Sequence, residues 1–238
     1  MIKTAIFVEG QTELIFVREF LLKISDYQDV SIECYTLFSD SEFKETEYQY
    51  SNKNATKHFQ LINVGNDNRV LTAMLRREKD LFNAGYHKII GLRDMYGEQY
   101  RQAVKTHIIK PEINQRFING ARGQLTNKNT HFVYSIMEIE AWLLGLRQAF
   151  QKLDARLTPQ YIQEQLNYNI EEIDPEVFFF HPANNVSDLY RLAGRGGYDK
   201  SKGEVNAIVS CIEKEDYLDL KNSGKCNSFN EFCSILNI

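Results

Sequence analysis

The stretch FVEGQTELIF, residues 7–16, is where the sequence first reveals its fold. It overlaps an apolar run, KTAIFV at residues 3–8, that is typical of a buried strand and is stopped by Gly10. An acidic side chain, Glu9, stands where this strand ends, and a second, Glu13, follows four residues later. Carboxylates at the junction of a strand and a helix require an explanation from the rest of the chain.

The residues beyond this junction continue an alternation of strands and helices. Thr12 is a suitable N-cap for the amphipathic helix that is predicted to follow the first strand. Residues 39–57 are polar and lack a helical stripe, so they form either a long loop or an exposed hairpin. Alternating patterns of this kind predict an α/β fold with a mostly parallel sheet flanked by helices. Further strands are expected at residues 30–38, 58–64, 87–94 and 130–136, and further helices at residues 66–82 and 137–150.

The pattern changes in the last third of the chain. From about residue 155 it becomes helical and irregular, with helices predicted at 161–166, 204–212 and 229–236. We therefore predict an α/β domain over residues 1–150 and a largely helical extension, packed on it, over residues 151–238.

The composition excludes several classes of protein. Of the 238 residues, 43% are hydrophobic and 25% are charged, which is ordinary for a globular protein. No apolar run approaches the roughly 20 residues that span a bilayer, and the N-terminus lacks a signal-peptide pattern. The cysteines show no CxxC spacing and are expected to be reduced thiols. These features predict a cytoplasmic protein with no membrane partner.

Basic side chains gather in two stretches, although the net charge is −4. Each stretch is either a solvated surface or a local patch that binds nucleic acid. The first, residues 101–128, has Glu112 as its one acid, and the second, residues 191–202, has Asp199. The basic residues are Arg101, Lys105, Lys110, Arg116, Arg122 and Lys128 in the first stretch, and Arg191, Arg195, Lys200 and Lys202 in the second.

The acids at strand ends are the main candidates for a functional site. Glu9 and Asp94 each end an apolar strand, and the carboxyl ends of parallel strands are where such sheets place their sites. A single acid of this kind more commonly caps a helix or pairs with an arginine. Several crowded carboxylates repel one another unless a cation joins them. We therefore expect Glu9, Glu13 and Asp94 to converge on Mg²⁺ or Mn²⁺.

Two more glutamates, Glu138 and Glu140, flank the apolar stripe of the helix predicted at residues 137–150. Helical periodicity does not choose between them. Glu138 is favoured as a further ligand because it opens this helix directly after a strand. The alternative is that both are ordinary surface acids beside Trp142.

Other common chemistries lack their sequence patterns. The histidines show no HExxH or paired spacing, and there is no GxSxG, Walker A or GxGxxG motif. The glycine-rich fragment GRGG at residues 194–197 lacks the lysine and hydroxyl residue of a phosphate-binding loop and is interpreted as a turn.

Three ordered motifs resemble those of TOPRIM domains. They are V-E-G-x-T-E at Val8–Glu13, D-x-Y-G at Asp94–Gly97 and E-x-E-A at Glu138–Ala141. The set is most similar to a bacterial TOPRIM-like family of unknown function, assigned by gene neighbourhood to antiphage defence and related to the overcoming-lysogenization-defect (OLD) nucleases. The later segments HPANNVSDLYRL and GGYDKSKG also resemble that family, so the resemblance spans almost the whole chain.

The resemblance implies roles for individual residues. Glu9 corresponds to the TOPRIM glutamate, a metal ligand or general acid/base, and Glu13 to a second acidic ligand. Asp94 corresponds to the first aspartate of the TOPRIM D-x-D motif, whereas Tyr96 stands in place of the second. Glu138 or Glu140 is then the candidate for the missing ligand. Lys200 or Lys202 corresponds to a late lysine that stabilises charge on the cleaved phosphate.

Two functions follow from this sequence. The preferred one is a Mg²⁺-dependent nuclease that hydrolyses the phosphodiester bonds of DNA or RNA. The alternative is a non-catalytic TOPRIM-like subunit that binds nucleic acid or a partner protein, and the tyrosine at position 96 favours it. OLD-like systems pair a TOPRIM domain with an ATPase, and this sequence has no ATPase motif, so a separate ATPase partner is expected by analogy.

Overall fold

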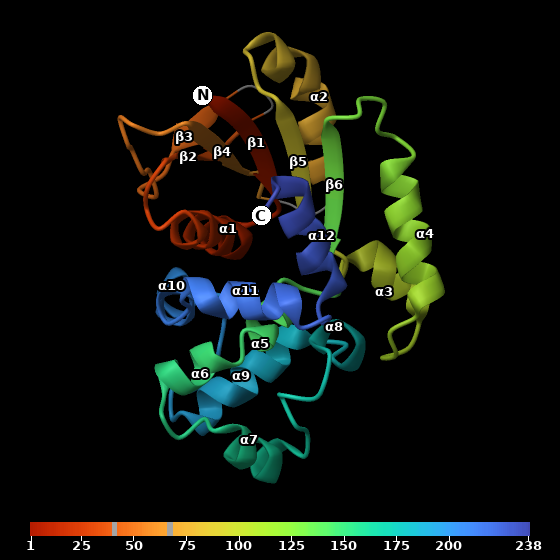
Figure 1. The fold of residues 1–238 in the computed structure, drawn as a ribbon. Coiled ribbons are helices and arrows are strands. Elements are labelled where there is room, and N and C mark those ends of the chain that lie inside the picture. The colour runs from red at the N-terminus through yellow and green to blue at the C-terminus, as the bar shows by residue number, and fades with distance from the viewer. Residues whose placement is uncertain (40–41, 66–68) are drawn as a thin grey trace. The chain divides into compact units, whose positions relative to one another are not determined.

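A computed structural model describes residues 1–39, 42–65 and 69–238 of the chain (Figure 1). The chain divides into two compact units. The first consists of Met1–Asp94 and Asn114–Tyr134, and the second of Met95–Ile113 and Ser135–Ile238. This division concerns compactness alone, and the domain boundary predicted between residues 150 and 151 stays a prediction.

The first unit is built on a six-stranded sheet with the strand order β3-β2-β4-β1-β5-β6. The strands β2, β4, β1 and β5 are parallel neighbours, and β3 is antiparallel to β2. This sheet and its flanking helices confirm the predicted α/β class. The strands are β1 (Ile2–Val8), β2 (Val30–Leu37), β3 (Phe43–Glu45), β4 (Lys57–Asn63), β5 (Lys88–Asp94) and β6 (Thr130–Ser135).

Two helical connections leave the centre of this sheet in opposite directions. Helix α1 (Gln11–Ile24) joins β1 to β2, and helix α2 (Val70–Asn83) joins β4 to β5. Because such crossovers are right-handed, opposite directions place α1 and α2 on opposite faces of the sheet (Figure 1). The neighbouring strands β1 and β4 therefore form the topological switch point, where α/β sheets commonly bind ligands beyond the carboxyl ends of the strands.

One predicted helix boundary of the first unit differs from the structure, and two further predicted segments lie partly outside the described residues. Thr12 is not the N-cap of α1: the helix begins one residue earlier, at Gln11, and its N-cap is Gly10. The predicted start of the second helix at residue 66 lies outside the described residues, and the described helix begins at Val70. In the polar stretch at residues 39–57, the described residues form one short exposed strand, β3, which pairs with β2, and residues 40–41 lie outside the described part.

The central strands are buried, as their continuous apolar runs predict. Four successive residues of β1, Ala5 to Val8, have no exposed surface. On β5, Gly91 allows β6 to approach closely, because an added Cβ would lie 2.6 Å from the ring of Phe132. These central strands fix the positions of the residues that follow them.

The second unit is helical. Its core surrounds Trp142, whose ring packs against Phe229 and Phe232 and whose indole N–H donates to the Glu176 carboxylate at 2.9 Å. The helices that lie wholly in this unit are α3 (Glu98–Val104), α5 (Glu140–Gly145), α6 (Gln148–Leu153), α7 (Pro159–Leu166), α8 (Pro175–Phe178), α9 (Pro182–Leu192), α10 (Lys202–Ser210), α11 (Lys214–Asn222) and α12 (Asn227–Leu236). Helix α4 (Pro111–Arg122) begins in this unit and continues into the first.

The single helix predicted at residues 137–150 is wrong. Met137 has a φ of 66°, a left-handed conformation that does not occur inside a helix, so α5 begins only at Glu140. The chain then leaves α5 after Gly145 and starts α6 at Gln148. As a result Glu138 precedes the helix in a turn instead of opening it. Among the described residues, no helix is long and apolar enough to cross a membrane.

Candidate functional site

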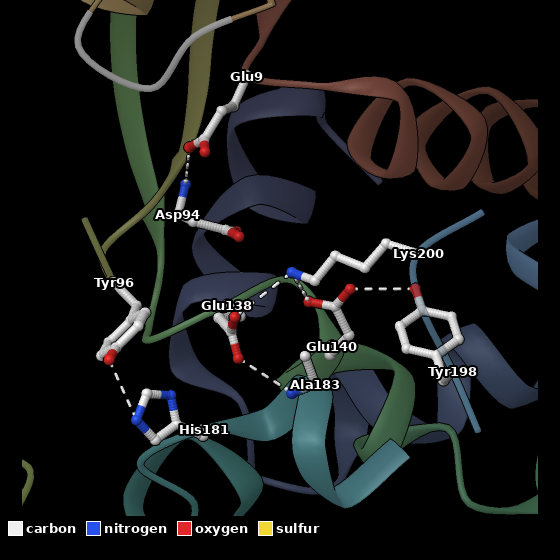
Figure 2. A network of polar contacts seen from close by, with 9 residues as sticks. All are labelled: Glu9, Asp94, Tyr96, Glu138, Glu140, His181, Ala183, Tyr198 and Lys200. Carbon is white, nitrogen blue, oxygen red and sulfur yellow. Dashed lines mark hydrogen bonds and ion pairs between the residues drawn. The ribbon is translucent and has the colours of Figure 1, made fainter. Parts of the chain in front are cut away.

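The first unit brings Glu9 and Asp94 together. Strands β1 and β5 are parallel and in register, with Val8 opposite Leu92, so the residues that follow them lie at the same edge of the sheet. The Glu9 carboxylate accepts a hydrogen bond from the backbone N–H of Asp94 at 3.2 Å (Figure 2). Asp94 is buried and Glu9 is half-buried. Their roles as metal ligands and Glu9's role as an acid/base group stay predictions.

Glu13 is also buried, in the first turn of α1. Its carboxylate turns back toward Gly10, where an added Cβ would lie 3.0 Å from Oε2. A side chain at position 10 would therefore require the Glu13 carboxylate to shift by a few tenths of an ångström. Glu13 lies close to the start of its own helix, where the helix dipole favours a negative charge.

The carboxylates of the first unit provide two of the oxygen ligands that Mg²⁺ takes, but not a full set. Carboxylate oxygens are the ligands that Mg²⁺ takes, and this ion commonly binds through one or two carboxylates together with water and substrate phosphates. Glu9 and Asp94 supply two such groups at one edge of the sheet. Within the described part of the chain, no group of three or more histidine, cysteine, aspartate or glutamate side chains is arranged to hold a metal ion. Glu13 therefore does not complete a three-ligand cluster there.

The second unit contains another pair of carboxylates, joined by a lysine. The ammonium of Lys200 lies 3.4 Å from Oε1 of Glu138 and 3.0 Å from Oε2 of Glu140 (Figure 2). Glu138 also accepts the backbone N–H of Ala183 at 3.0 Å, at the start of α9. The Lys200 ammonium therefore offsets the repulsion between these two carboxylates.

Glu140 is the most deeply buried of these acids, with no exposed surface. Burial raises its pKa above the ordinary value, and the neighbouring Lys200 ammonium opposes this rise. The hydroxyl of Tyr198 donates to Oε1 of Glu140 at 3.0 Å, which also favours the charged form. Glu140 and Glu138 are both buried, so the alternative that they are surface acids is wrong.

Lys200 contacts the carboxylates of both Glu138 and Glu140. It has a φ of 62°, which turns the chain just before α10, and its side chain reaches the start of α5. Lys202 is exposed as the first residue of α10. Whether Glu138, Glu140 and Lys200 act together with Glu9 and Asp94 stays a prediction, because the two sets belong to different units.

Tyr96, in the position of the second TOPRIM aspartate, is engaged by a histidine. Its hydroxyl lies 3.1 Å from Nε2 of His181 (Figure 2). Its ring also meets the ring of Phe180 edge to face. Burial lowers the pKa of His181, so the neutral imidazole can accept the tyrosine hydroxyl. An aromatic residue with a fixed partner thus occupies this position instead of a carboxylate.

Most of the basic side chains in the two predicted stretches are exposed. Arg101, Lys105 and Lys202 are exposed, whereas Lys110 and Lys200 are half-buried. Arg191 pairs with Asp188 on α9 at 2.7 Å. The first stretch is divided between the two units at residue 113.

Sequence reasoning missed two residues that contact the candidate site residues, Tyr198 and His181. Both lie in the late segments that resemble the TOPRIM-like family, but no spacing rule connects them to their partners. Tyr198 lies 58 positions from Glu140, and His181 lies 85 positions from Tyr96.

No protein-family model matches the chain, and no curated protein or solved structure shows a significant match to it. The resemblance to the TOPRIM-like family therefore rests on the motifs in the sequence.

Proposed function

We propose that the protein is a Mg²⁺- or Mn²⁺-dependent nuclease whose metal is held by Glu9 and Asp94. The observation that supports this most strongly is the contact between these two acidic residues at the carboxyl edge of a parallel sheet. Glu9 directly follows β1, one of the two strands at the topological switch point. Both features are typical of a ligand site in an α/β fold.

The bound metal would polarise the phosphodiester and lower the pKa of a water molecule. Glu9 and Asp94 would hold it through carboxylate oxygens. The Asp94 N–H, by donating to Glu9, fixes the orientation of the Glu9 carboxylate before any ligand arrives. In the second unit, Lys200 carries the positive charge that the resemblance assigns to phosphate stabilisation, and it is held between Glu138 and Glu140.

The biological setting is part of the same proposal. We place the activity in the cytoplasm, on DNA or RNA, in antiphage defence and with a separate ATPase as partner. These points rest on the resemblance and on the sequence.

A specific observation favours the alternative function, a non-catalytic subunit that binds nucleic acid or a partner protein. Tyr96 occupies the second TOPRIM aspartate position and is held by His181 and Phe180. Lys200 already neutralises Glu138 and Glu140, the candidates for the missing ligand. On this reading the chain keeps the surface that binds nucleic acid and has lost the metal chemistry.

Metal binding can be tested independently of cleavage. Mn²⁺ should raise the melting temperature, because a ligand that binds only the folded state stabilises it. Glu9→Gln and Asp94→Asn should each abolish this shift, whereas Glu45→Gln, an exposed acid on β3, should leave it unchanged. A shift that persists in both site variants would place the metal elsewhere.

Cleavage provides the second test. With Mn²⁺ present, the protein should degrade single-stranded or duplex DNA or RNA, and Glu9→Gln should reduce the rate roughly 100-fold or more. Nucleic-acid binding without cleavage and without a Mn²⁺-dependent melting shift would decide for the non-catalytic alternative.

A further inference from the structure

The second unit carries a group of aromatic rings that is not part of its core. Tyr96, His107, Phe180 and His181, here called the aromatic cluster, come from two segments far apart in the sequence. His107 is exposed and the other three are half-buried. The rings around Trp142, in contrast, are fully buried and have an evident packing role. The aromatic cluster thus places ring surface where a ligand can reach it.

The rings meet one another in a connected arrangement. Phe180 lies edge to face with Tyr96 at 5.6 Å, with His181 at 5.0 Å and with His107 at 5.3 Å between ring centres. Tyr96 and His181 are joined by the hydrogen bond at 3.1 Å, which fixes both rings (Figure 2). In an edge-to-face contact the edge of one ring packs against the face of another. These contacts hold the rings in place while each ring stays partly exposed.

The surroundings of the cluster are basic. The guanidinium of Arg101 lies over the ring of Tyr96 at 5.6 Å from its centre, and Lys105 follows it, exposed, at the end of α3. The contributing segments contain no acid between Glu98 and Glu112, or between Glu176 and Asp188. A carboxylate that reaches this region, that of Glu138, accepts the Ala183 N–H and is paired with Lys200.

Rings next to cationic side chains match the chemistry of one ligand class. Proteins bind single-stranded nucleic acid by stacking bases on aromatic side chains while basic groups meet the phosphates. Duplex bases are already stacked on one another and cannot use such a surface without being unpaired. Resting on the proposed function, we infer that the aromatic cluster, with Arg101 and Lys105, is a binding site for single-stranded DNA or RNA.

The first unit offers a matched control. There the guanidinium of Arg77 lies over the exposed ring of Phe43 at 5.1 Å, and Phe43 meets Tyr35 edge to face. The surroundings of Arg77 and Phe43 contain acidic side chains. Tyr35 donates a hydrogen bond to Glu33, and Glu45 stands two residues after Phe43 in the same strand. The same ring-and-guanidinium pairing beside carboxylates should not attract a polyanion.

The binding test uses fluorescein-labelled oligothymidine and oligouridine in EDTA, so that nothing is cleaved. The protein should bind these single strands more tightly than a labelled duplex. Phe180→Leu, which keeps an apolar side chain but removes the ring, should weaken binding about fivefold to 150-fold without changing its salt dependence. Arg101→Ala should weaken binding and reduce the salt slope by about one. Phe43→Ala should bind as the unaltered protein does.

Circular dichroism and melting of each variant establish that it is folded, and Tyr96→Leu serves in place of Phe180→Leu if that variant does not fold. Wild-type affinity in a folded Phe180→Leu or Tyr96→Leu variant would overturn the inference, as would equal affinity for single strands and duplex.

The proposed nuclease is judged separately. Mn²⁺-dependent cleavage lost in Glu9→Gln, together with ring variants that bind normally, would uphold the nuclease and reject the aromatic site. Suppose instead that binding in EDTA depends on the rings, and that Glu9→Gln changes neither cleavage nor the rise in melting temperature caused by Mn²⁺. That outcome would uphold the aromatic site and reject the nuclease site at Glu9.

Discussion

The two carboxylate pairs of the molecule are stabilised by different kinds of partner. In the first unit, Glu9 is oriented by a neutral donor, the backbone N–H of Asp94. In the second, Glu138 and Glu140 share a cation that belongs to the chain, Lys200. A pair with its own ammonium is expected to hold the fold together, whereas carboxylates at the carboxyl ends of parallel strands are placed to hold an external cation. Variants of Lys200, Tyr198 and Glu9 test this contrast, and Glu176, a further buried acid of the second unit, extends it.

Removal of the lysine should have the largest effect. Lys200→Met leaves the fully buried Glu140 without its cation, so we expect the free energy of unfolding at pH 7 to fall by roughly 3–5 kcal/mol. Urea denaturation measures the loss, and Lys202→Met, an exposed lysine two residues on, is the control and should change stability by less than about 0.5 kcal/mol. The double variant with Glu140→Gln should recover part of the loss. Equal stability of the two lysine variants would contradict the assignment of Lys200 as the built-in cation.

A second buried acid should make stability depend on pH. Burial raises the pKa of Glu176 to about 7 from its ordinary 4.5, although hydrogen bonds from Ser228 and Trp142 oppose the rise. Between these pH values the folded protein holds a proton that the unfolded chain has released. Stability should therefore fall as pH rises from 4.5 through 7, by about 3 kcal/mol in total.

Urea denaturation across this range, with Glu176→Gln beside the unaltered protein, measures the effect. The variant should lose this part of the pH dependence. Identical pH profiles for the two proteins would show that Glu176 does not titrate in this range.

The hydroxyl that supports Glu140 should contribute less. Tyr198→Phe removes a hydrogen bond to a buried carboxylate and should lower the free energy of unfolding by about 2 kcal/mol. Tyr35→Phe is the matched change in the first unit, where the hydroxyl donates at 3.2 Å to Glu33, whose side chain is half exposed. It should cost less than about 0.5 kcal/mol. A larger loss for Tyr35→Phe than for Tyr198→Phe would reverse the expected difference between the units.

The smallest change is expected at Glu9. Glu9→Gln keeps an oxygen that accepts the Asp94 N–H and removes one of two neighbouring negative charges. Stability without metal should change by less than about 1 kcal/mol, as measured by denaturation in EDTA. A loss above about 2 kcal/mol would show that Glu9 is a structural acid like Glu140, and the contrast between the pairs would fail.

Much of the first unit could be predicted because its signals are local. The apolar runs marked strands within one or two residues of β1, β2, β4, β5 and β6. The ends of helices were less predictable. Gly10 caps α1 where Thr12 had been expected, since either residue can precede a helix. The break at Met137 left no mark in the sequence, because a methionine at positive φ is held there by its surroundings.

The sequence by itself determined the α/β class and the meeting of Glu9 and Asp94 at one edge of the sheet. Both follow from apolar runs and from the rule that parallel strands gather their carboxyl ends. Only the tertiary structure decided that Lys200 lies between Glu138 and Glu140, that Tyr198 supports Glu140 and that Tyr96 pairs with His181. These contacts join residues 58 to 85 positions apart, and their geometry depends on how helices pack, which no periodic pattern along the chain encodes.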